Sequence, residues 1–253
     1  MNNLFSVEGR VIIVTGCAQG IGFNYARGLA NHGARLAICD RQEDKLQMAE
    51  NTLAAIGNEV MAAPVDVTVP EQVQNFVTKT MERYGHIDAL VNNAGVLLRR
   101  LPEEMTAEEW DFIQDVNVKG TFLFSQAAGR EMIKRKHGAI VNIASIGSRQ
   151  ALSLRLGYCT SKAAVEQFTR TLAYEWGRYN IRVNAIAPGY IKSDMNADLR
   201  ANPEIYNKMV SEVPLGRFGE ADDLLGTLIY LCSPASAYVS GQTVYVDGGK
   251  TTQ

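Results

Sequence analysis

The chain has 253 residues and a formal net charge of −2, with 46% hydrophobic and 21% charged residues. This length suits one α/β domain, and the composition is that of a folded globular protein. The nearly balanced charge argues against a nucleic-acid partner, which requires a basic surface. No stretch approaches the roughly 18 apolar residues of a membrane-spanning helix, so no membrane association is expected.

Strands and helices are predicted to alternate along the chain. The β-branched run at 11–14 is typical of a strand buried on both faces, and the helical pattern that follows it ends at Gly33. Further strands are predicted at 35–39, 59–64, 89–91, 139–143, 182–186 and 243–246, and helices at 43–55, 70–84, 108–134 (interrupted near Gly120), 159–179 and 222–231. This order predicts a single α/β domain over residues 1–253, a doubly wound parallel sheet of the Rossmann type with helices on both faces.

One long segment interrupts this alternation. Residues 188–213 contain prolines and show only weak apolar periodicity. Long connections in compact domains are usually functional, so a substrate lid is predicted at about 190–213. The alternative is a surface loop that does not act as a lid.

A glycine-rich turn links the first strand to the first helix. Gly16, Gly20 and Gly22 place bare backbone N–H groups beside a helix N-terminus, which suits a pyrophosphate. The spacing differs from the usual Gly-x-Gly-x-x-Gly fingerprint, so the prediction depends on the strand–turn–helix context.

Asp40 ends the second predicted strand, 18 residues beyond Gly22. A carboxylate there bonds the ribose hydroxyls of a dinucleotide and repels a 2′-phosphate, which favours NAD over NADP. Arg41 follows directly, and pairing with a phosphate would oppose this preference. A residue that caps the strand is the structural alternative for Asp40.

Tyr158 and Lys162 are four residues apart near the start of a predicted helix, so they share one face. A free tyrosine has a pKa of about 10, and a neighbouring positive charge lowers it. The pair therefore predicts a tyrosine that transfers protons in catalysis.

No metal site is predicted, because the four cysteines form no Cys-x-x-Cys pair and the three histidines are scattered. Free thiols in a chain of this size indicate a reducing compartment, and a cytoplasmic location is expected.

From Thr15 to Gly249 the chain resembles the short-chain dehydrogenases/reductases. The resemblance rests on these motifs in order: Thr15-Gly16-x-x-x-Gly20-x-Gly22, Asp66-Val67, Asn92-Asn93-Ala94-Gly95, Asn117, Ser145, Tyr158-x-x-x-Lys162 and Pro188-Gly189. It implies an NAD(H)-dependent enzyme that interconverts secondary alcohols and ketones, and a homotetramer. A non-catalytic dinucleotide sensor is the alternative from another class, and the complete set of catalytic residues argues against it.

The resemblance also implies residue roles. Tyr158 is the general acid/base, and Ser145 hydrogen-bonds the substrate oxygen as charge develops. Lys162 holds the nicotinamide ribose and lowers the tyrosine pKa, and Asn117 anchors a water in a proton relay to Lys162. The implied cofactor contacts are Gly16, Gln19, Gly20, Ile21, Gly22, Asp40, Arg41, Asp66, Val67, Asn93, Ala94, Gly95, Tyr158, Lys162, Pro188, Gly189, Ile191 and Ser193.

The segments expected to wall the pocket indicate the class of substrate. They are rich in cationic and amide side chains, which suit a carboxylate and several hydroxyls, and the predicted contacts are Arg99, Arg149, Gln150 and Tyr190. The Asn-Asn-Ala-Gly segment followed by Arg99-Arg100, together with Ala187-Pro188-Gly189-Tyr190 and Gly216-Arg217-Phe218-Gly219, resembles the family's sugar-acid and polyol branch. That branch includes gluconate 5-dehydrogenases and deoxy-ketogluconate dehydrogenases. The alternative for these arginines is that they are solvated surface charges. The alternative activities are a 3-oxoacyl-carrier reductase, which Asp40 argues against, and a hydroxysteroid dehydrogenase with a pocket lined by leucines such as Leu97 and Leu98.

Overall fold

The computed structural model describes residues 3–57, 59–193 and 196–252. In this part of the chain seven strands form one sheet: β1 (Val11–Thr15), β2 (Arg35–Asp40), β3 (Val60–Pro64), β4 (Ala89–Asn92), β5 (Gly138–Ile143), β6 (Ile181–Pro188) and β7 (Thr243–Val246). Their order is β3-β2-β1-β4-β5-β6-β7, and every neighbouring pair is parallel. The predicted doubly wound parallel sheet is therefore confirmed.

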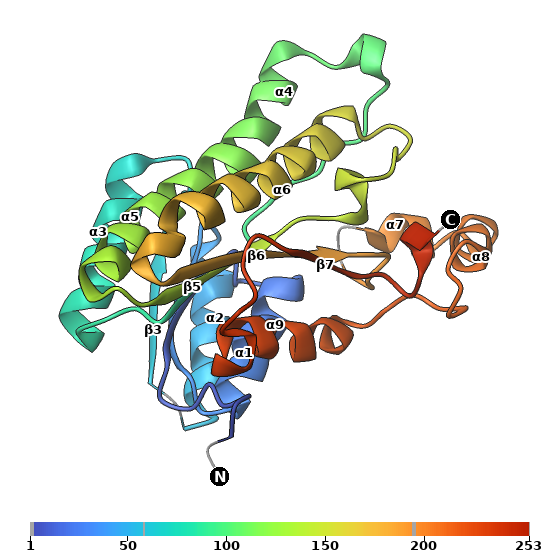
Figure 1. Cartoon of the computed structure of the whole chain (residues 1–253). Coiled ribbons are helices and arrows are strands. Elements are labelled where there is room, and N and C mark those ends of the chain that lie inside the picture. Colours follow the sequence, from blue (N-terminus) through green and yellow to red (C-terminus); the bar gives the residue numbers. More distant parts are fainter. Residues whose placement is uncertain (1–2, 58, 194–195, 253) are drawn as a thin grey trace.

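Helices cover both faces of the sheet (Figure 1). They are α1 (Gly20–Asn31), α2 (Glu43–Ala54), α3 (Pro70–Tyr84), α4 (Ala107–Gln114), α5 (Gly120–Arg135), α6 (Leu156–Trp176), α7 (Ala197–Arg200), α8 (Pro203–Ser211) and α9 (Leu225–Cys232). One core cluster joins the sheet to α1, α2 and α9, and a second joins its other face to α3, α5 and α6.

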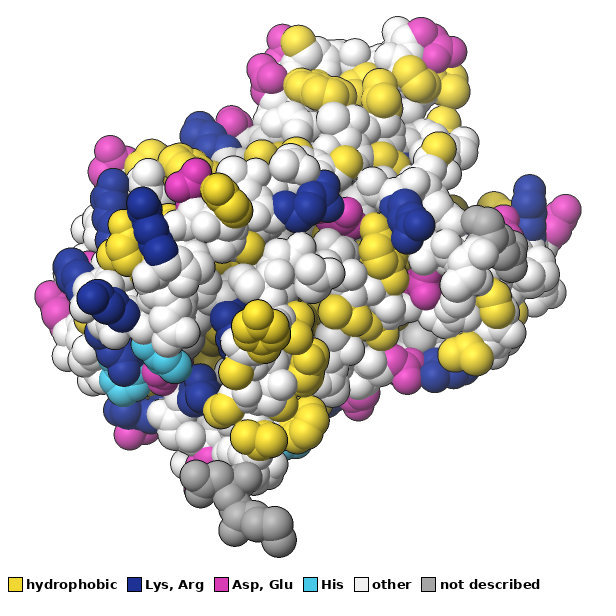
Figure 2. All heavy atoms as spheres, in the orientation of Figure 1, with side chains coloured by type: hydrophobic (Ala, Val, Ile, Leu, Met, Phe, Trp, Pro, Cys, Tyr) yellow, Lys and Arg dark blue, Asp and Glu magenta, His cyan; other side chains and the backbone are white. Residues whose placement is uncertain are grey.

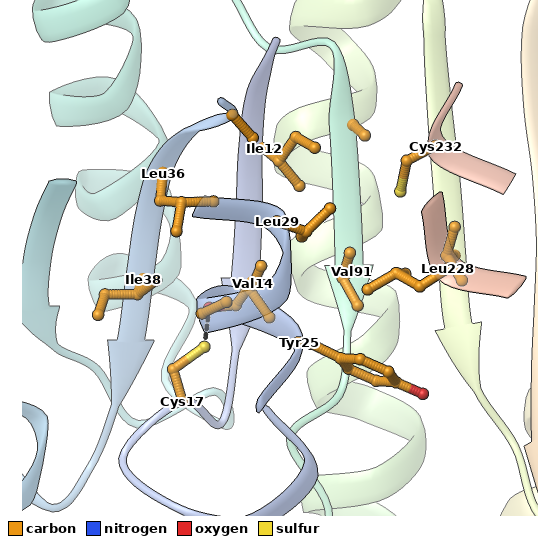
Figure 3. Packing of buried hydrophobic residues seen from close by; sticks show 14 of the residues in the cluster. Ile12, Val14, Cys17, Tyr25, Leu29, Leu36, Ile38, Val91, Leu228 and Cys232 are labelled. Atoms are coloured by element: carbon orange, nitrogen blue, oxygen red, sulfur yellow. Dashed lines mark hydrogen bonds between the residues drawn. The ribbon is translucent and has the colours of Figure 1, made fainter. Parts of the chain in front are cut away.

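Alternation along the strands produces these two cores. In β1, Ile12 and Val14 belong to the first cluster, whereas Val11 and Ile13 belong to the second. Figure 3 shows Ile12 and Val14 packed with Leu29 of α1 and with Val91 of β4. Since successive side chains of a strand point to opposite faces, a strand covered on both sides must be apolar throughout, as the run at 11–14 is.

The predicted helix at 108–134 is divided into α4, a π-helical turn (Asp115–Lys119) and α5. The interruption expected near Gly120 is present, and it lies just before that glycine. A Cβ on Gly120 would lie 2.7 Å from the Cγ2 atom of Val67, so close packing requires a glycine there. Single π-helical turns within α-helices often lie at functional sites.

The segment at 188–213 contains two helices, α7 and α8, that the sequence analysis missed. The Asn202 side chain caps α8 by accepting hydrogen bonds from the backbone N–H groups of Glu204 and Ile205. Pro203 takes the first helical position, where its missing N–H is harmless. The Asn-Pro pair was therefore a start signal that the weak periodicity obscured.

No helix in the described ranges is long and apolar enough to cross a membrane. The cytoplasmic location stays a prediction.

Candidate active site

The carboxyl ends of the strands open into a cleft of about 760 Å³. The strand order reverses between β1 and β4, the position where open parallel sheets bind ligands. Every residue predicted to contact the cofactor lines this cleft, and so does Ser145. The fold thus brings together residues from position 16 to position 193 of the chain.

The glycine-rich turn can be formed only with glycine at particular positions. Gly16 and Gly20 have φ angles of +69° and +62°, in the left-handed region that other residues rarely adopt. A Cβ on Gly22 would lie 2.0 Å from the carbonyl oxygen of Gly16, whereas a Cβ on Gly20 would meet no atom within 4 Å. The turn is therefore closely packed at Gly22 and has free space at Gly20, the first residue of α1.

Asn93, which follows β4, braces this turn. Its Nδ2 atom donates to the carbonyl oxygens of Thr15 and Gly16, both at 3.0 Å. In return the Thr15 hydroxyl accepts from the backbone N–H groups of Asn93 (3.1 Å) and Ala94 (3.0 Å). These bonds fix the segment after β4 against the glycine-rich turn, so the Asn93 side chain acts on the backbone of the site.

The Asp40 carboxylate is fixed at the end of β2. Its Oδ2 atom accepts from the Ala18 N–H and its Oδ1 atom from the Gln42 N–H, each at 3.0 Å. Cations stand nearby, since Arg41 lines the cleft and Lys45 donates to the Gln19 side chain at 2.6 Å. This end of the cleft therefore presents one fixed carboxylate and the cationic Arg41, and Lys45 is bonded to the lining residue Gln19.

Ser145, Tyr158 and Lys162 lie together at the other end of the cleft. Ser145 follows β5, and its hydroxyl accepts from the Gly147 N–H at 3.0 Å. Tyr158 and Lys162 come from the first turns of α6, and the Lys162 Nζ atom lies 5.8 Å from the centre of the Tyr158 ring. That ammonium also donates to the carbonyl oxygen of Ile143, in β5, at 2.7 Å. Strand β5 and helix α6 thus position all three groups.

Burial changes the proton affinity of both titratable groups. It raises the pKa of Tyr158, and the hydrogen bond with the Ser145 hydroxyl lowers that pKa only in part. Burial also lowers the pKa of Lys162 to about 8. The sequence predicts a lowered tyrosine pKa, but the net direction here is upward, because desolvation of the phenolate dominates and the ammonium is directed to the Ile143 carbonyl. At neutral pH the phenol therefore carries its proton.

Asn117 lies in the π-helical turn and is buried beneath the cleft. Its Oδ1 atom accepts from the Val96 N–H at 2.8 Å, and its Nδ2 atom donates to the Val96 carbonyl (3.0 Å) and the Ser161 hydroxyl (2.9 Å). A Cβ on Gly95 would lie 3.2 Å from that Oδ1 atom and 3.4 Å from Lys162 Nζ. Asn117 therefore ties the segment after β4 to α6, and its role as a water anchor stays a prediction.

The four predicted substrate contacts do not line the cleft. Arg99 pairs with Asp198 (2.8 Å), the Arg149 guanidinium stands 5.8 Å from the Tyr245 ring centre, and Gln150 donates to the Lys250 carbonyl (3.2 Å). Tyr190 donates to Glu212 at 3.1 Å and lines a separate cavity of about 170 Å³. Each of these side chains has a partner outside the cleft.

Several cleft residues were missed by the sequence analysis. Phe112 and Val116 reach the cleft from α4 and the π-helical turn, together with Asp115 and Asn196. Val96, Leu97 and Leu98, in contrast, belong to a segment that was expected to wall the pocket, and they extend the apolar part of the wall. Helical spacing alone does not distinguish Phe112 and Val116 from core residues, so the sequence held no usable signal for them.

Among the described residues, no group of three or more His, Cys, Asp or Glu side chains is arranged to hold a metal ion. The cleft does fit a dinucleotide. It offers a glycine-rich turn with free space at Gly20, the N-terminus of α1, and a fixed carboxylate at the end of β2. Fold and cleft together define a dinucleotide-binding α/β protein.

Comparison with known proteins extends this assignment. A family profile described as enoyl-(acyl carrier protein) reductase matches residues 16–251. The chain is 39% identical to the 5-keto-D-gluconate 5-reductase of Escherichia coli (strain K12), over 98% of each chain. A crystal structure of a gluconate 5-dehydrogenase from Burkholderia cenocepacia J2315, in complex with NADP and tartrate, matches with a TM-score of 0.95 and 37% identity, over 99% of this chain and 98% of that one. A short-chain type dehydrogenase/reductase from Mycobacterium marinum matches with a TM-score of 0.93 and 36% identity, over 99% and 98%.

The chain belongs to the short-chain dehydrogenase/reductase family. The resemblance predicted from the ordered motifs is thereby confirmed.

Proposed function

We propose that this protein interconverts a secondary alcohol and a ketone on a sugar acid or polyol, with a nicotinamide dinucleotide as cofactor. The observation that carries the proposal is the cleft, which has the glycine-rich turn at one end and Ser145, Tyr158 and Lys162 at the other. The similarity to two relatives, a 5-keto-D-gluconate 5-reductase and a gluconate 5-dehydrogenase, supports a sugar acid as substrate.

In the proposed mechanism, Tyr158 transfers the proton of the reacting oxygen. During ketone reduction the phenol donates its proton to that oxygen, and during alcohol oxidation the phenolate takes it back. The Ser145 hydroxyl hydrogen-bonds the same oxygen and stabilises its developing charge. The Lys162 ammonium lies 5.8 Å from the ring centre, and Asn117 continues the proton path toward Lys162. When bound, the nicotinamide supplies or accepts the hydride.

The test is turnover of a substrate panel with NAD⁺ and NADP⁺ at alkaline pH. The panel holds sugar acids, hexitols, hydroxysteroids and 3-hydroxyacyl thioesters, because Leu97, Leu98 and Phe112 also suit an apolar alcohol. We expect turnover of a sugar acid or polyol, lost in Tyr158→Phe. Turnover confined to an apolar alcohol would refute the substrate class, and full activity of the variant would refute the mechanism.

We further propose that NAD is preferred over NADP. The fixed Asp40 carboxylate supports this, because it suits ribose hydroxyls and repels a 2′-phosphate. Arg41 and Lys45 act in the opposite direction, and the Burkholderia relative was crystallised with NADP. Asp40→Ala should move the ratio of NAD to NADP dissociation constants at least tenfold toward NADP, while Asp44→Ala, an exposed change on α2, should leave it unchanged. An unaltered ratio in Asp40→Ala would refute the proposal.

We propose that the segment at 190–213 closes over the substrate. Ion pairs and hydrogen bonds tie it to the rest of the chain, through Asp198 to Arg99 (2.8 Å) and through Glu212 to Lys250 (3.5 Å). In Figure 1, α7 and α8 stand apart from the helices on the two faces of the sheet. Trypsin cleavage at Arg200 and Lys208 should slow when cofactor and substrate are both added. Unchanged cleavage would contradict the idea.

We also propose a homotetramer. Large apolar side chains are exposed on α5 (Phe122), on α6 (Tyr174) and in the segment before β7 (Tyr238). Figure 2 shows hydrophobic side chains at the surface around the outer end of α4. Sedimentation should give four copies for the wild type and smaller species for Tyr174→Glu, with Met48→Glu on α2 as the matched control. A monomeric wild type would refute the proposal.

A further inference from the structure

A buried carboxylate lies on the same face of α6 as the proposed proton-transfer pair. Tyr158, Lys162 and Glu166 follow one another at intervals of four residues, so they share one side of the helix. Glu166 is buried one helical turn beyond Lys162, and it takes no part in the proposed mechanism. Because a buried carboxylate has to be compensated by hydrogen bonds or cations, its partners indicate what it does in the fold.

The partners of Glu166 come from the turn that follows β5, from β7 and from α6 itself. The Ser148 hydroxyl bonds the Oε1 atom of Glu166, and the Tyr245 hydroxyl donates to the same atom at 2.6 Å. Arg170, one turn further along α6, forms an ion pair with the Oε2 atom at 3.6 Å. The carboxylate therefore joins α6 to two other elements of the fold.

Ser148 connects this carboxylate to the turn that carries Ser145. Its hydroxyl lies 2.5 Å from the Ser145 carbonyl oxygen, and a hydroxyl has one proton, which that oxygen shares with Glu166. The turn is a short 3₁₀ helix (Ile146–Ser148) with Ser145 at its N-cap, and the Ser145 hydroxyl accepts from the Gly147 N–H. A shift of Ser148 would therefore move the backbone of Ser145.

The same turn also packs closely against α6 at Gly147. A Cβ on Gly147 would lie 3.1 Å from the Sγ atom of Cys159, which follows Tyr158 on α6, and 3.4 Å from Ser145 Oγ. The turn thus meets α6 at Cys159 and again, about two helical turns later, at Glu166. One helix therefore carries Tyr158 and also fixes the turn on which Ser145 lies.

We propose that Glu166 is a positioning residue that holds Ser145 in place relative to Tyr158, by fixing the turn at 145–148 against α6. The inference rests on the proposed function, because it requires Ser145 to bond the reacting oxygen. Groups that stabilise a developing charge act best when they are fixed before the reaction, and a misplacement of about 1 Å can cost roughly 100-fold in rate. Loss of Glu166 should therefore slow the chemical step rather than weaken cofactor binding.

The experiment measures kcat with a substrate that the panel identifies, and the dissociation constant of NADH by fluorescence. Glu166→Leu should lower kcat about 10- to 100-fold and change the NADH dissociation constant less than threefold. Glu166→Gln keeps an acceptor oxygen for Ser148, so it should restore kcat to within about threefold of the wild type. Glu175→Leu, a change at an exposed position of the same helix, should alter neither quantity.

A double-mutant cycle distinguishes positioning from a general structural effect. Ser145→Ala alone should lower the rate of a single turnover about 100- to 1,000-fold, the usual loss for a donor to a developing oxyanion. Glu166→Leu should then change the rate of Ser145→Ala less than about twofold, because the group that it positions is gone. Thermal denaturation confirms that each variant is folded. Ser148→Ala, which removes the link itself, replaces Glu166→Leu in the cycle if that variant does not fold.

The outcomes separate this inference from the proposed function. If the wild type turns over no member of the panel, the proposed function fails and this inference fails with it. If the wild type is active but Glu166→Leu keeps its kcat, or slows Ser145→Ala as much as it slows the wild type, the inference alone is refuted.

Discussion

The glycine-rich turn supplies a sharp test of how sequence determines the site, because Gly22 and Gly20 differ in their surroundings. A Cβ on Gly22 would lie 2.0 Å from the Gly16 carbonyl oxygen and 2.4 Å from Asn93 Nδ2. Neither neighbour is free to move, since Asn93 Nδ2 is bonded to both Thr15 and Gly16. Gly22→Ala therefore has to displace backbone and break these two hydrogen bonds.

The expected losses differ in size. Overpacking and two lost hydrogen bonds predict that Gly22→Ala lowers the free energy of unfolding by about 3–5 kcal/mol. For a chain of this length that corresponds to a Tm lower by roughly 6–20 °C. Gly20→Ala meets open space, so its cost is the left-handed conformation alone, about 1–2 kcal/mol. Its Tm should fall by roughly 2–8 °C.

The assay pairs thermal denaturation with NADH binding followed by fluorescence. Gly20→Ala should retain most of its stability yet bind NADH at least tenfold more weakly, because Gly20 lines the cleft and its free space is where we expect the pyrophosphate. Gly22→Ala should lose both. Equal stability of the two variants would refute the packing argument at Gly22. Wild-type NADH affinity in Gly20→Ala would show that the turn does not hold a pyrophosphate as argued.

Further predictions concern buried polar groups. In the folded chain the pKa of Lys162 is lowered from 10.5 to about 8. Between these pH values the unfolded chain binds more protons than the folded chain, so the free energy of unfolding should rise with pH. Relative to Lys162→Met, the rise across this window should be about 3 kcal/mol. Both proteins should carry Tyr158→Phe, because the raised tyrosine pKa has the opposite effect on stability above pH 10. If the difference in the free energy of unfolding between the two proteins, measured in urea, stays constant from pH 8 to 10, the assignment is contradicted. The Tyr25 hydroxyl is buried with no hydrogen-bond partner among the described residues, so Tyr25→Phe should leave the free energy of unfolding unchanged or raise it by about 1 kcal/mol. Tyr84→Phe, which loses a 2.9 Å bond to the Leu36 carbonyl, should lower it by about 1 kcal/mol, and the reverse order would refute this reasoning.

Much of the fold could be predicted because it depends on local patterns. The run at 11–14 is apolar at every position, which identifies a strand covered on both faces, and the alternation of strands with helices then leaves few possible topologies. The prediction for α3, Pro70–Tyr84, matches the observed bounds. By contrast, α7 and α8 were missed because their start signals stand in a segment with little apolar periodicity.

The candidate site divides in the same way. The glycines and the Tyr158–Lys162 pair could be chosen from the sequence because turn geometry and helical spacing are local constraints. The direction of the Tyr158 pKa could not, since burial of the phenol depends on what the rest of the chain packs around it. The predicted substrate contacts could not be tested from the sequence either, because it does not reveal that Arg149 lies over the Tyr245 ring or that Gln150 donates to the Lys250 carbonyl.

The sequence by itself therefore determined which functional group follows which element: a glycine-rich turn after β1, a carboxylate at the end of β2 and a proton-transfer pair on α6. Only the tertiary structure decided which side chains face the cleft and which groups lose their water, as Tyr158 and Lys162 do. The reason is physical. Conformational preference acts between neighbours in sequence, whereas desolvation and charge pairing act between neighbours in space.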